Sequence, residues 1–468
     1  MEKHKHKPLL KIVDSIMTLL SFAGLGLVLW IALEKRNLAL FAWNPMFRNF
    51  YLGLVILAIV IPVLVFLDLR RHKKREQKTS LGLVSYILVI LGLALALGIP
   101  AAEGTFSTHA DKAPQLMLLG KSDTQGNPEL ALVWYTKKPE KGKVFYGLSA
   151  EHLEYSVEEE KPMQSHGLIL SALQRGKTYY YSSSETPEVR SFRYFPQYDG
   201  GLRLAISSDA HVGAETNDLG ATVDILRQVV DPKNDYSLIC NLGDVVELGN
   251  KDSQIAAQVE LFSHFTDSLP LIQVLGNHDG WFGGYANWAQ TYYPKSLQEE
   301  AQLYHRFDIT DSIHIITLDL EWGTESYDAK QKAWLLKQLD SLDPNDVIII
   351  MDHAYFFGSS TEYQGVPWYD NQQMITTFHQ LFVDHGVDLV FSGHDHQFEH
   401  ILQDGVNYFI VGTFGGKFDD SPTYISPGSI FRDFSHHGYA DVLVKEHEVS
   451  VTFRQPDGTA LYSWGKNL

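Results

Sequence analysis

Residues 270–280 read PLIQVLGNHDG, an apolar run that ends in a cluster of polar side chains. Short runs rich in Val, Ile and Leu are typical of buried strands, and loops at strand ends are where a rigid sheet can hold reactive groups in place. Four other runs between residues 202 and 396 end in residues of metal-binding type: Leu202 to Asp209-Ala-His211, Tyr236 to Gly243-Asp244, Val347 to Asp352-His353, and Val387 to Gly393-His394-Asp395-His396. The sequence therefore predicts that five strand ends bring these groups to one place.

Carboxylates, a carboxamide and imidazoles are ligands for hard and borderline metal ions. Two such ions, about 3.5 to 4 Å apart, can acidify a shared water, neutralise a phosphate and clamp both ends of a displacement. We therefore expect a two-metal hydrolytic centre. The ligand types leave the metals open among Mn, Fe and Zn, because availability decides occupancy as much as ligand type does.

The ordered series D-x-H, G-D, G-N-H-D, H and G-H-D-H, spread from Asp209 to His396, resembles the calcineurin-like metallophosphoesterase superfamily. The resemblance covers residues 202–455 and implies an α/β fold of two mixed β-sheets flanked by helices. It implies that one metal is held by Asp209, His211 and His396, that the second is held by Asn277, His353 and His394, and that Asp244 bridges them. His278 would be a catalytic residue that is not a ligand, oriented and charged by Asp279 with a raised pKa, while Asp352 and Asp395 receive no role.

The resemblance implies hydrolysis of a small phosphate monoester, phosphodiester or pyrophosphate by a metal-bridging hydroxide, with His278 assisting the leaving group. The alternative is a catalytically silent metal-binding receptor or adhesion module at the cell surface. A non-ligand acid such as His278 favours catalysis, because a pure binding site does not need one. A metalloprotease is disfavoured because the chain has no His-Glu-x-x-His sequence.

Residues 114–195 contain short alternating segments separated by turn residues, which is the pattern of a small antiparallel sandwich. This part of the chain resembles the fibronectin-III-like domain of purple acid phosphatases. The matching segments are Val133-Trp134-Tyr135-Thr136 and Val144-Phe145-Tyr146-Gly147. The metal blocks depart from those enzymes, because His211 has no counterpart there and Glu247 stands where their iron-binding Tyr would be. Without that phenolate, no purple charge-transfer colour is expected.

From Leu202 onward, apolar runs alternate with amphipathic stretches at 219–230, 253–265, 329–342 and 371–385, which indicates an α/β layer domain. After Gly405 only strand-like segments follow, and we expect a second sheet to pack on the first. The predicted domains are a membrane domain over 1–100, a fibronectin-III-like sandwich over 101–197, and a metallophosphoesterase domain over 198–468.

Three uncharged apolar stretches, Ser15 to Leu33, Phe50 to Leu67 and Leu81 to Pro100, are long enough to cross a bilayer, which takes about 17 to 25 residues. The flanking Lys and Arg place the N-terminus in the cytoplasm and the catalytic domain outside. The fold class thus includes a three-helix transmembrane segment, and the predicted location is the cell membrane with three spans. An alternative is that the third stretch is a signal peptide cleaved near Ala101. The absence of an Asn-x-Ser/Thr site favours a bacterial exported domain.

The chain has a formal net charge of −18; residues 1–100 hold 13 Lys+Arg and 5 Asp+Glu, which leaves 25 and 51 for the rest of the chain. The remainder is therefore strongly acidic, which disfavours extended nucleic acid as a partner. We expect a small phosphate-containing substrate, with a nucleotide, a sugar nucleotide and a lipid head group as candidates. The loops after Asp279 and His353 are rich in aromatic residues, among them Trp281 and Trp368, and could select the substrate.

Overall fold

The computed structural model describes residues 109–195, 201–297, 302–343, 345–363, 366–445 and 448–467. The three predicted membrane spans lie outside these ranges. Among the described residues, no helix is both long enough and apolar enough to cross a bilayer. This finding corrects the predicted fold class and the predicted location: the three-helix transmembrane segment and the multi-pass placement have no support in the structure.

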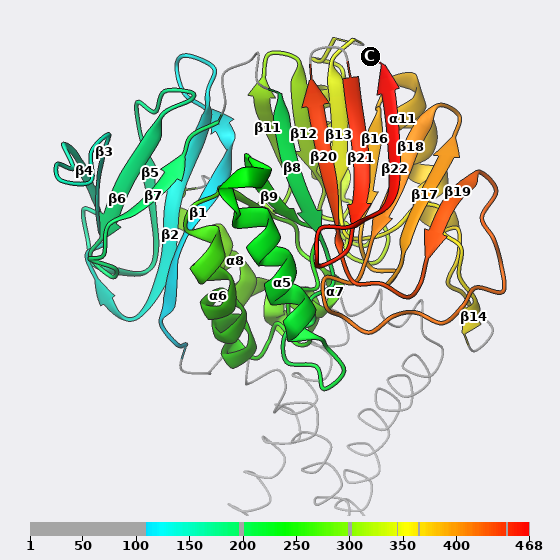
Figure 1. Ribbon diagram of the computed structural model, residues 1–468, viewed down its shortest axis with the longest axis horizontal. Helices are drawn as coiled ribbons and strands as arrows, with labels where there is room; N and C mark the ends of the chain where they lie inside the picture. The colour runs from blue at the N-terminus through cyan, green and yellow to red at the C-terminus, as the bar shows by residue number, and fades with distance from the viewer. Residues whose placement is uncertain are drawn as a thin grey trace, which may run out of the picture. The chain divides into compact units, whose positions relative to one another are not determined.

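Within the described part of the chain, the first and largest sheet is mixed (Figure 1). Its nine strands lie side by side in the order β22 (Ala460–Asn467), β21 (Glu448–Arg454), β20 (Tyr439–Lys445), β8 (Leu202–Ser207), β9 (Leu238–Asn241), β10 (Leu271–Gln273), β1 (Lys112–Ser122), β2 (Pro128–Glu140) and β5 (Met163–Leu170). The central strands β8, β9, β10 and β1 run parallel to one another, and the pairs on either side are antiparallel.

A second mixed sheet packs against the first through a shared apolar core. Its seven described strands follow the order β11 (His305–Thr310), β12 (Ile313–Thr317), β13 (Val347–Met351), β16 (Leu389–Ser392), β18 (Val406–Val411), β17 (Phe398–Gln403) and β19 (Ser429–Asp433). Leu204 and Val442 from the first sheet meet Ile349 and Phe409 from the second in this core. The expectation that a second sheet packs on the first is confirmed, and the strands after Gly405 are divided between the two sheets.

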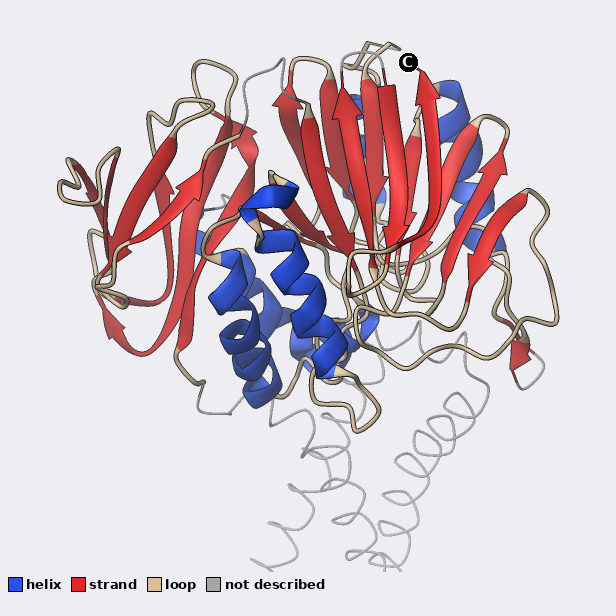
Figure 2. Ribbon diagram, in the orientation of Figure 1, coloured by secondary structure: helices blue, strands red, loops and turns tan. Residues whose placement is uncertain are grey.

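Helices cover the outer faces of both sheets, which gives a four-layer arrangement (Figure 2). The first sheet is covered by α5 (Leu219–Val230), α6 (Asp252–Thr266) and α8 (Gly284–Tyr292), and the second by α9 (Ala329–Leu339), α10 (Gln372–Met374), a π-helical turn (Ile375–His379) and α11 (Gln380–Asp384). Asp218 and Asp328 cap α5 and α9 by accepting bonds from first-turn N–H groups. The predicted helix over 371–385 begins one residue later because Asn371 is its cap.

The predicted sandwich is present, but it is continuous with the large sheet. Strands β1, β2 and β5 form one of its faces, and the other is a four-stranded sheet in the order β4 (Tyr155–Glu158), β3 (Lys143–Gly147), β6 (Thr178–Ser183) and β7 (Arg190–Arg193). Strand β1 also pairs with β10, with Met117 opposite Leu271. All described residues belong to one compact unit, and the predicted boundaries at 101, 197 and 198 stay predictions.

Candidate metal centre

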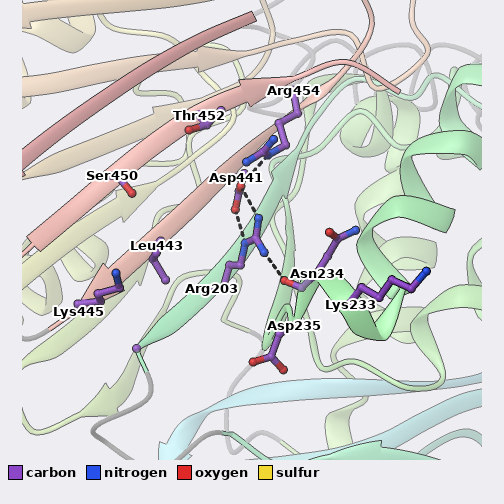
Figure 3. A pocket seen from close by; sticks show the side chains of 11 residues that line it. Arg203, Lys233, Asn234, Asp235, Asp441, Leu443, Lys445, Ser450, Thr452 and Arg454 are labelled. Atoms are coloured by element: carbon purple, nitrogen blue, oxygen red, sulfur yellow. Dashed lines mark hydrogen bonds and ion pairs between the residues drawn. The ribbon is translucent and has the colours of Figure 1, made fainter. Parts of the chain in front are cut away.

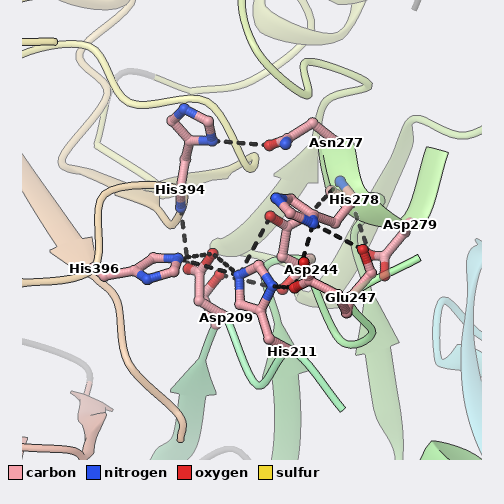
Figure 4. A network of polar contacts seen from close by, with 12 residues as sticks. Asp209, His211, Asp244, Glu247, Asn277, His278, Asp279, His394 and His396 are labelled. Atoms are coloured by element: carbon pink, nitrogen blue, oxygen red, sulfur yellow. Dashed lines mark hydrogen bonds and ion pairs between the residues drawn. The ribbon is translucent and has the colours of Figure 1, made fainter. Parts of the chain in front are cut away.

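The predicted ligands come together where strands of both sheets end (Figure 4). Asp209 and His211 follow β8, Asp244 follows β9, and Asn277 with His278 forms the short helix α7 (Asn277–Gly280) after β10. His353 follows β13 of the second sheet, and His394 and His396 follow β16. Backbone bonds join these loops, with the N–H of His211 donating to Asp244 and the N–H of Gly393 donating to His353. The site is therefore held by the ends of five neighbouring strands, as the sequence predicts.

The backbone at the site is forced into unusual conformations. Asp209, His211, Asp244 and His394 all have positive φ, at 61°, 45°, 49° and 69° respectively. Such values cost energy for residues other than glycine and persist where the surroundings enforce them, which occurs most often at functional sites. The glycines of the motifs explain the crowding: a Cβ on Gly276 would lie 2.2 Å from Asp244, and one on Gly393 would lie 2.0 Å from Ser208 Oγ.

The first predicted ligand set forms a tight triangle of ligand atoms. His211 Nε2 lies 3.1 Å from His396 Nε2 and 3.7 Å from Asp209 Oδ1, and His396 Nε2 lies 3.4 Å from Asp209 Oδ1. Atoms that share an ion at about 2.1 Å are about 3 to 3.5 Å apart, so the triangle fits a single cation. The contacts to Asp209 are too long for good hydrogen bonds, which leaves that buried oxygen poorly satisfied by protein groups alone.

The second predicted set has similar dimensions. Asn277 Oδ1 lies 2.9 Å from His353 Nε2 and 2.8 Å from His394 Nδ1. Asp244 Oδ2 lies 3.3 Å from His353 Nε2 and 3.7 Å from His211 Nε2, so this carboxylate touches both sets. Groups of potential ligand atoms within 4.8 Å of one another include Asp209, His211 and His396, and Asp244, His353 and His394; a further group joins His278 to His211 and Asp244.

Three of the histidines are oriented by bonds on their outer ring nitrogen. Nδ1 of His353 contacts the Leu242 carbonyl at 2.8 Å, Nδ1 of His396 contacts the Lys417 carbonyl, and Nδ1 of His211 contacts Glu247 Oε2 at 2.9 Å. Each bond leaves Nε2 facing the centre of the site. This arrangement is how proteins fix metal-ligating imidazoles and set which nitrogen is available.

The electrostatics show how the buried charges balance in the protein alone. Burial opposes ionisation, yet bonds to Asp209 and Glu247 raise the pKa of His211 to about 10, and the charge of Asp244 raises the pKa of His353 to about 9. The histidine charges in turn hold the pKa values of Asp209 and Asp244 below their usual range despite burial. Burial and the charge of His353 lower the pKa of His394 to about 3. In the metal-free protein, protons on the His211 and His353 rings thus supply the positive charge that bound metal ions would supply.

His278 lies in the site, but Asp279 does not orient it. Nδ1 of His278 contacts the Glu247 carbonyl oxygen at 2.8 Å, and the His278 N–H donates to Asp244 Oδ1. The Asp279 carboxylate instead accepts the backbone N–H groups of Gly276 and Val246. Burial lowers the pKa of His278, so the expected raised value is wrong for the protein alone. Asp279 stabilises the turn that carries the motif, and its burial near Asp244 raises its own pKa to about 8.

Sequence reasoning missed several supporting residues. Glu247 contacts both His211 and His278. Its position in the sequence indicates only that the iron-binding Tyr of purple acid phosphatases is replaced. Asp419 accepts the N–H of His396 at 2.7 Å, and the loop before it approaches so closely that a Cβ on Gly416 would lie 2.6 Å from the Asp209 carbonyl. The pair Gly415-Gly416 is the only sequence signal for that approach. Trp322, whose ring lies 4.8 Å from that of His394, carried no signal at all.

A second charged cluster lies at the opposite end of β8, beside a cavity of about 370 Å³ (Figure 3). Asp441 accepts two bonds from Arg203, at 2.8 and 2.7 Å, and one from Arg454 at 2.7 Å. Although burial opposes ionisation, these arginines hold the pKa of Asp441 below its usual range. The carboxylate is fully paired, so this cluster has the character of a structural ion pair.

The chain is similar to known phosphoesterases. A family model described as calcineurin-like phosphoesterase matches residues 202–398. Purple acid phosphatase 18 of Arabidopsis thaliana is 22% identical over 350 residues, which cover 70% of this chain and 73% of that protein. Phosphoenolpyruvate phosphatase of Allium cepa is 23% identical over 367 residues, covering 71% and 73%.

The fold comparison agrees. A purple acid phosphatase from yellow lupin, Lupinus luteus, superposes with a TM-score of 0.63 at 15% identity, covering 76% of this chain and 74% of that chain. The sandwich that precedes the metal loops fits the architecture of purple acid phosphatases, as the sequence predicts. Residues 202–398 match the calcineurin-like phosphoesterase family model, and the chain is a metal-dependent phosphoric ester hydrolase similar to the purple acid phosphatases.

Proposed function

We propose that the chain hydrolyses a small phosphate ester at a centre of two metal ions held by the seven side chains identified above. Asp209, His211 and His396 would hold one ion, Asn277, His353 and His394 the other, and Asp244 both. The observation that carries this proposal is the position of Asp244 Oδ2, 3.3 Å from His353 Nε2 and 3.7 Å from His211 Nε2. One carboxylate oxygen thus lies within reach of a ligand from each set.

The bound ions would supply an acidified water as the nucleophile and would neutralise charge on the phosphate. Side chains of the protein would supply the proton that the leaving group needs. In the reaction, a water oxygen forms a bond to phosphorus, the bond to the leaving oxygen breaks, and that oxygen takes up a proton. His278 would give this proton from Nε2 in its doubly protonated form, while its Nδ1–H donates to the Glu247 carbonyl.

The test is kinetic and uses the full chain. The purified protein is stripped of metal, reconstituted separately with Mn, Fe and Zn, and assayed on 4-nitrophenyl phosphate and bis(4-nitrophenyl) phosphate. We expect activity to disappear on stripping and to return with at least one metal, at two ions per chain. Undiminished turnover after complete stripping would contradict the proposal, and so would turnover with a single ion bound per chain.

The identity of the metals can be tested by colour. In purple acid phosphatases an iron-binding Tyr gives the charge-transfer band, but here Glu247 stands at that position and its carboxylate contacts His211. We therefore expect the iron-loaded protein to show no phenolate-to-iron band in the visible spectrum. Glu247→Tyr is the matched variant, since it restores the phenol at that position, and it should gain such a band if iron binds beside His211.

A further inference from the structure

Three tryptophans form a continuous surface beside the metal centre, which we call the tryptophan wall: Trp281, Trp322 and Trp368. Ring centroids of Trp281 and Trp322 are 5.8 Å apart, and those of Trp322 and Trp368 are 5.6 Å apart. The three rings come from three separate loops, which follow β10, β12 and β13. The wall is therefore assembled only when the sheets bring these loops together.

The wall touches both ends of the reacting site. Trp281 lies 4.1 Å from the ring of His278, centroid to centroid. Trp322 lies 4.8 Å from the ring of His394, and Trp368 lies 5.8 Å from it and almost parallel to it, at an angle of 8°. Because His278 is the proposed proton donor to the leaving oxygen, the organic group on that oxygen must lie next to Trp281.

The wall lies outside the hydrophobic clusters of the described residues, although its middle ring, Trp322, is buried, with 6% exposure. Two other aromatic residues from the same parts of the chain, Trp288 and Phe356, are buried in the hydrophobic clusters beneath the helices. None of the three wall residues belongs to any of the hydrophobic clusters found among the described residues, and Trp281 and Trp368 are only partly buried. Partly exposed indoles such as Trp281 and Trp368, beside a reactive centre, are suited to binding a flat apolar group.

The loops hold the wall in place without help from a ligand. The N–H of Trp322 donates to Glu325 Oε1 at 2.9 Å, and Asn371 Nδ2 donates to the Trp322 carbonyl at 3.2 Å. The N–H of Trp368 donates to the Thr361 carbonyl at 3.0 Å. Since the surface is already ordered, stacking on it costs little conformational entropy.

Resting on the proposed function, we propose that the tryptophan wall binds a planar aromatic leaving group, so that the enzyme prefers phosphate esters carrying such a group over aliphatic ones. An aryl ester and a nucleotide share this chemistry. Stacking of a base on an aromatic side chain contributes on the order of a tenfold or larger gain in affinity. The wall therefore acts in substrate selection, and the reaction itself stays with the metal ligands and His278.

The sharpest test compares adenosine 5′-monophosphate with ribose 5-phosphate, because both release the same primary alcohol oxygen and differ only in the base. We expect wild-type kcat/KM to favour the nucleotide, and Trp281→Ala or Trp368→Ala to reduce this preference about tenfold. Trp281→Phe keeps a ring and should retain most of the preference. Trp334→Leu is the control, since Trp334 packs on Tyr304 in the helix layer away from the site. 4-Nitrophenyl phosphate then tells whether a smaller ring is sufficient.

An unchanged ratio of the two rates in both alanine variants would overturn the inference, and so would an equal loss on both substrates. Binding of adenosine alone, followed by quenching of tryptophan fluorescence, separates this result from failure of the proposed function. Quenching that is lost in Trp281→Ala supports the wall even if no ester is hydrolysed. Absence of quenching in the wild-type protein contradicts the wall even if hydrolysis is metal-dependent.

Discussion

The two ends of strand β8 carry buried charge in opposite ways. At its start, Asp441 is bound by two arginines through three short hydrogen bonds. Past its end, Asp209 Oδ1 has only imidazole contacts of 3.4 and 3.7 Å, on a backbone with φ of 61°. Buried charge is costly unless it is paired. A cluster that is complete in itself supports the fold, whereas one that is strained and incomplete is built for a ligand.

The largest effect that follows from this contrast concerns Asp244. In Asp244→Asn the shared carboxylate oxygen is replaced by an amide of the same shape, which weakens the hold on both ions. We expect kcat/KM to fall by more than about a hundredfold. Loss of a residue that only supports a metal ligand costs up to about a hundredfold, and the loss of a shared ligand should exceed this. Metal analysis of the purified variant should show fewer than two ions per chain. If the variant kept full activity and two ions, the proposal that the far end of β8 binds metal while its start holds a structural ion pair would be contradicted.

Glu247 gives the next effect, because it supports the site without being one of its proposed ligands. In Glu247→Gln the His211 ring loses a charged partner at 2.9 Å but keeps a polar one of the same size. We expect affinity for metal to fall about 10- to 100-fold. Titration of the stripped protein with each metal measures this. Glu260→Gln on the exposed face of α6 is the control, and equal affinities in the two variants would count against the role of Glu247.

The reciprocal change is made at the paired end. In Asp441→Asn, Arg203 and Arg454 lose their shared anion, which is buried while they are partly exposed. We expect the free energy of unfolding to fall by about 1 to 3 kcal/mol, with no change in kcat/KM of the folded protein. Denaturant melts and rates on the same samples check this. A loss of activity without a loss of stability would reverse the assignment of the two clusters.

The smallest effect is a difference in pH dependence. The folded pKa values of His211 and His353 are raised to about 10 and about 9, above the ordinary value of about 6.5. Their charged pairs therefore stabilise the metal-free protein fully below about pH 6.5, and this stability is lost as the pH rises through 9 to 10. Asp441 and Arg203 do not titrate in that range, because the pKa of Asp441 is lowered and that of Arg203 is raised. We expect the Tm of stripped protein to fall between pH 7 and 10, while metal-loaded protein falls less because cations replace those protons.

The sequence predicted which side chains come together better than it predicted the groups around them. Asp209, Asp244, Asn277 and His394 could be found because each follows an apolar run and a fixed short motif, and strand ends of one sheet meet at one edge. The role of Asp279 was wrong because a motif shows adjacency along the chain, while the partner of the His278 ring comes from Glu247 in another loop. The position of Trp322 at the site could not be predicted for the same reason, because its spatial neighbours Trp281 and Trp368 lie about forty residues away on either side in the sequence.

The single pairing of Met117 with Leu271 makes β1 the outer neighbour of β10. Strand β10 leads directly into Asn277 and His278, so the chain preceding residue 202 protects the strand that delivers them. A shortened protein beginning at Leu202 would present β10 as a bare edge, with unpaired N–H and C=O groups ready to associate with another molecule. We therefore expect the sandwich and the hydrolytic part to fold as one unit.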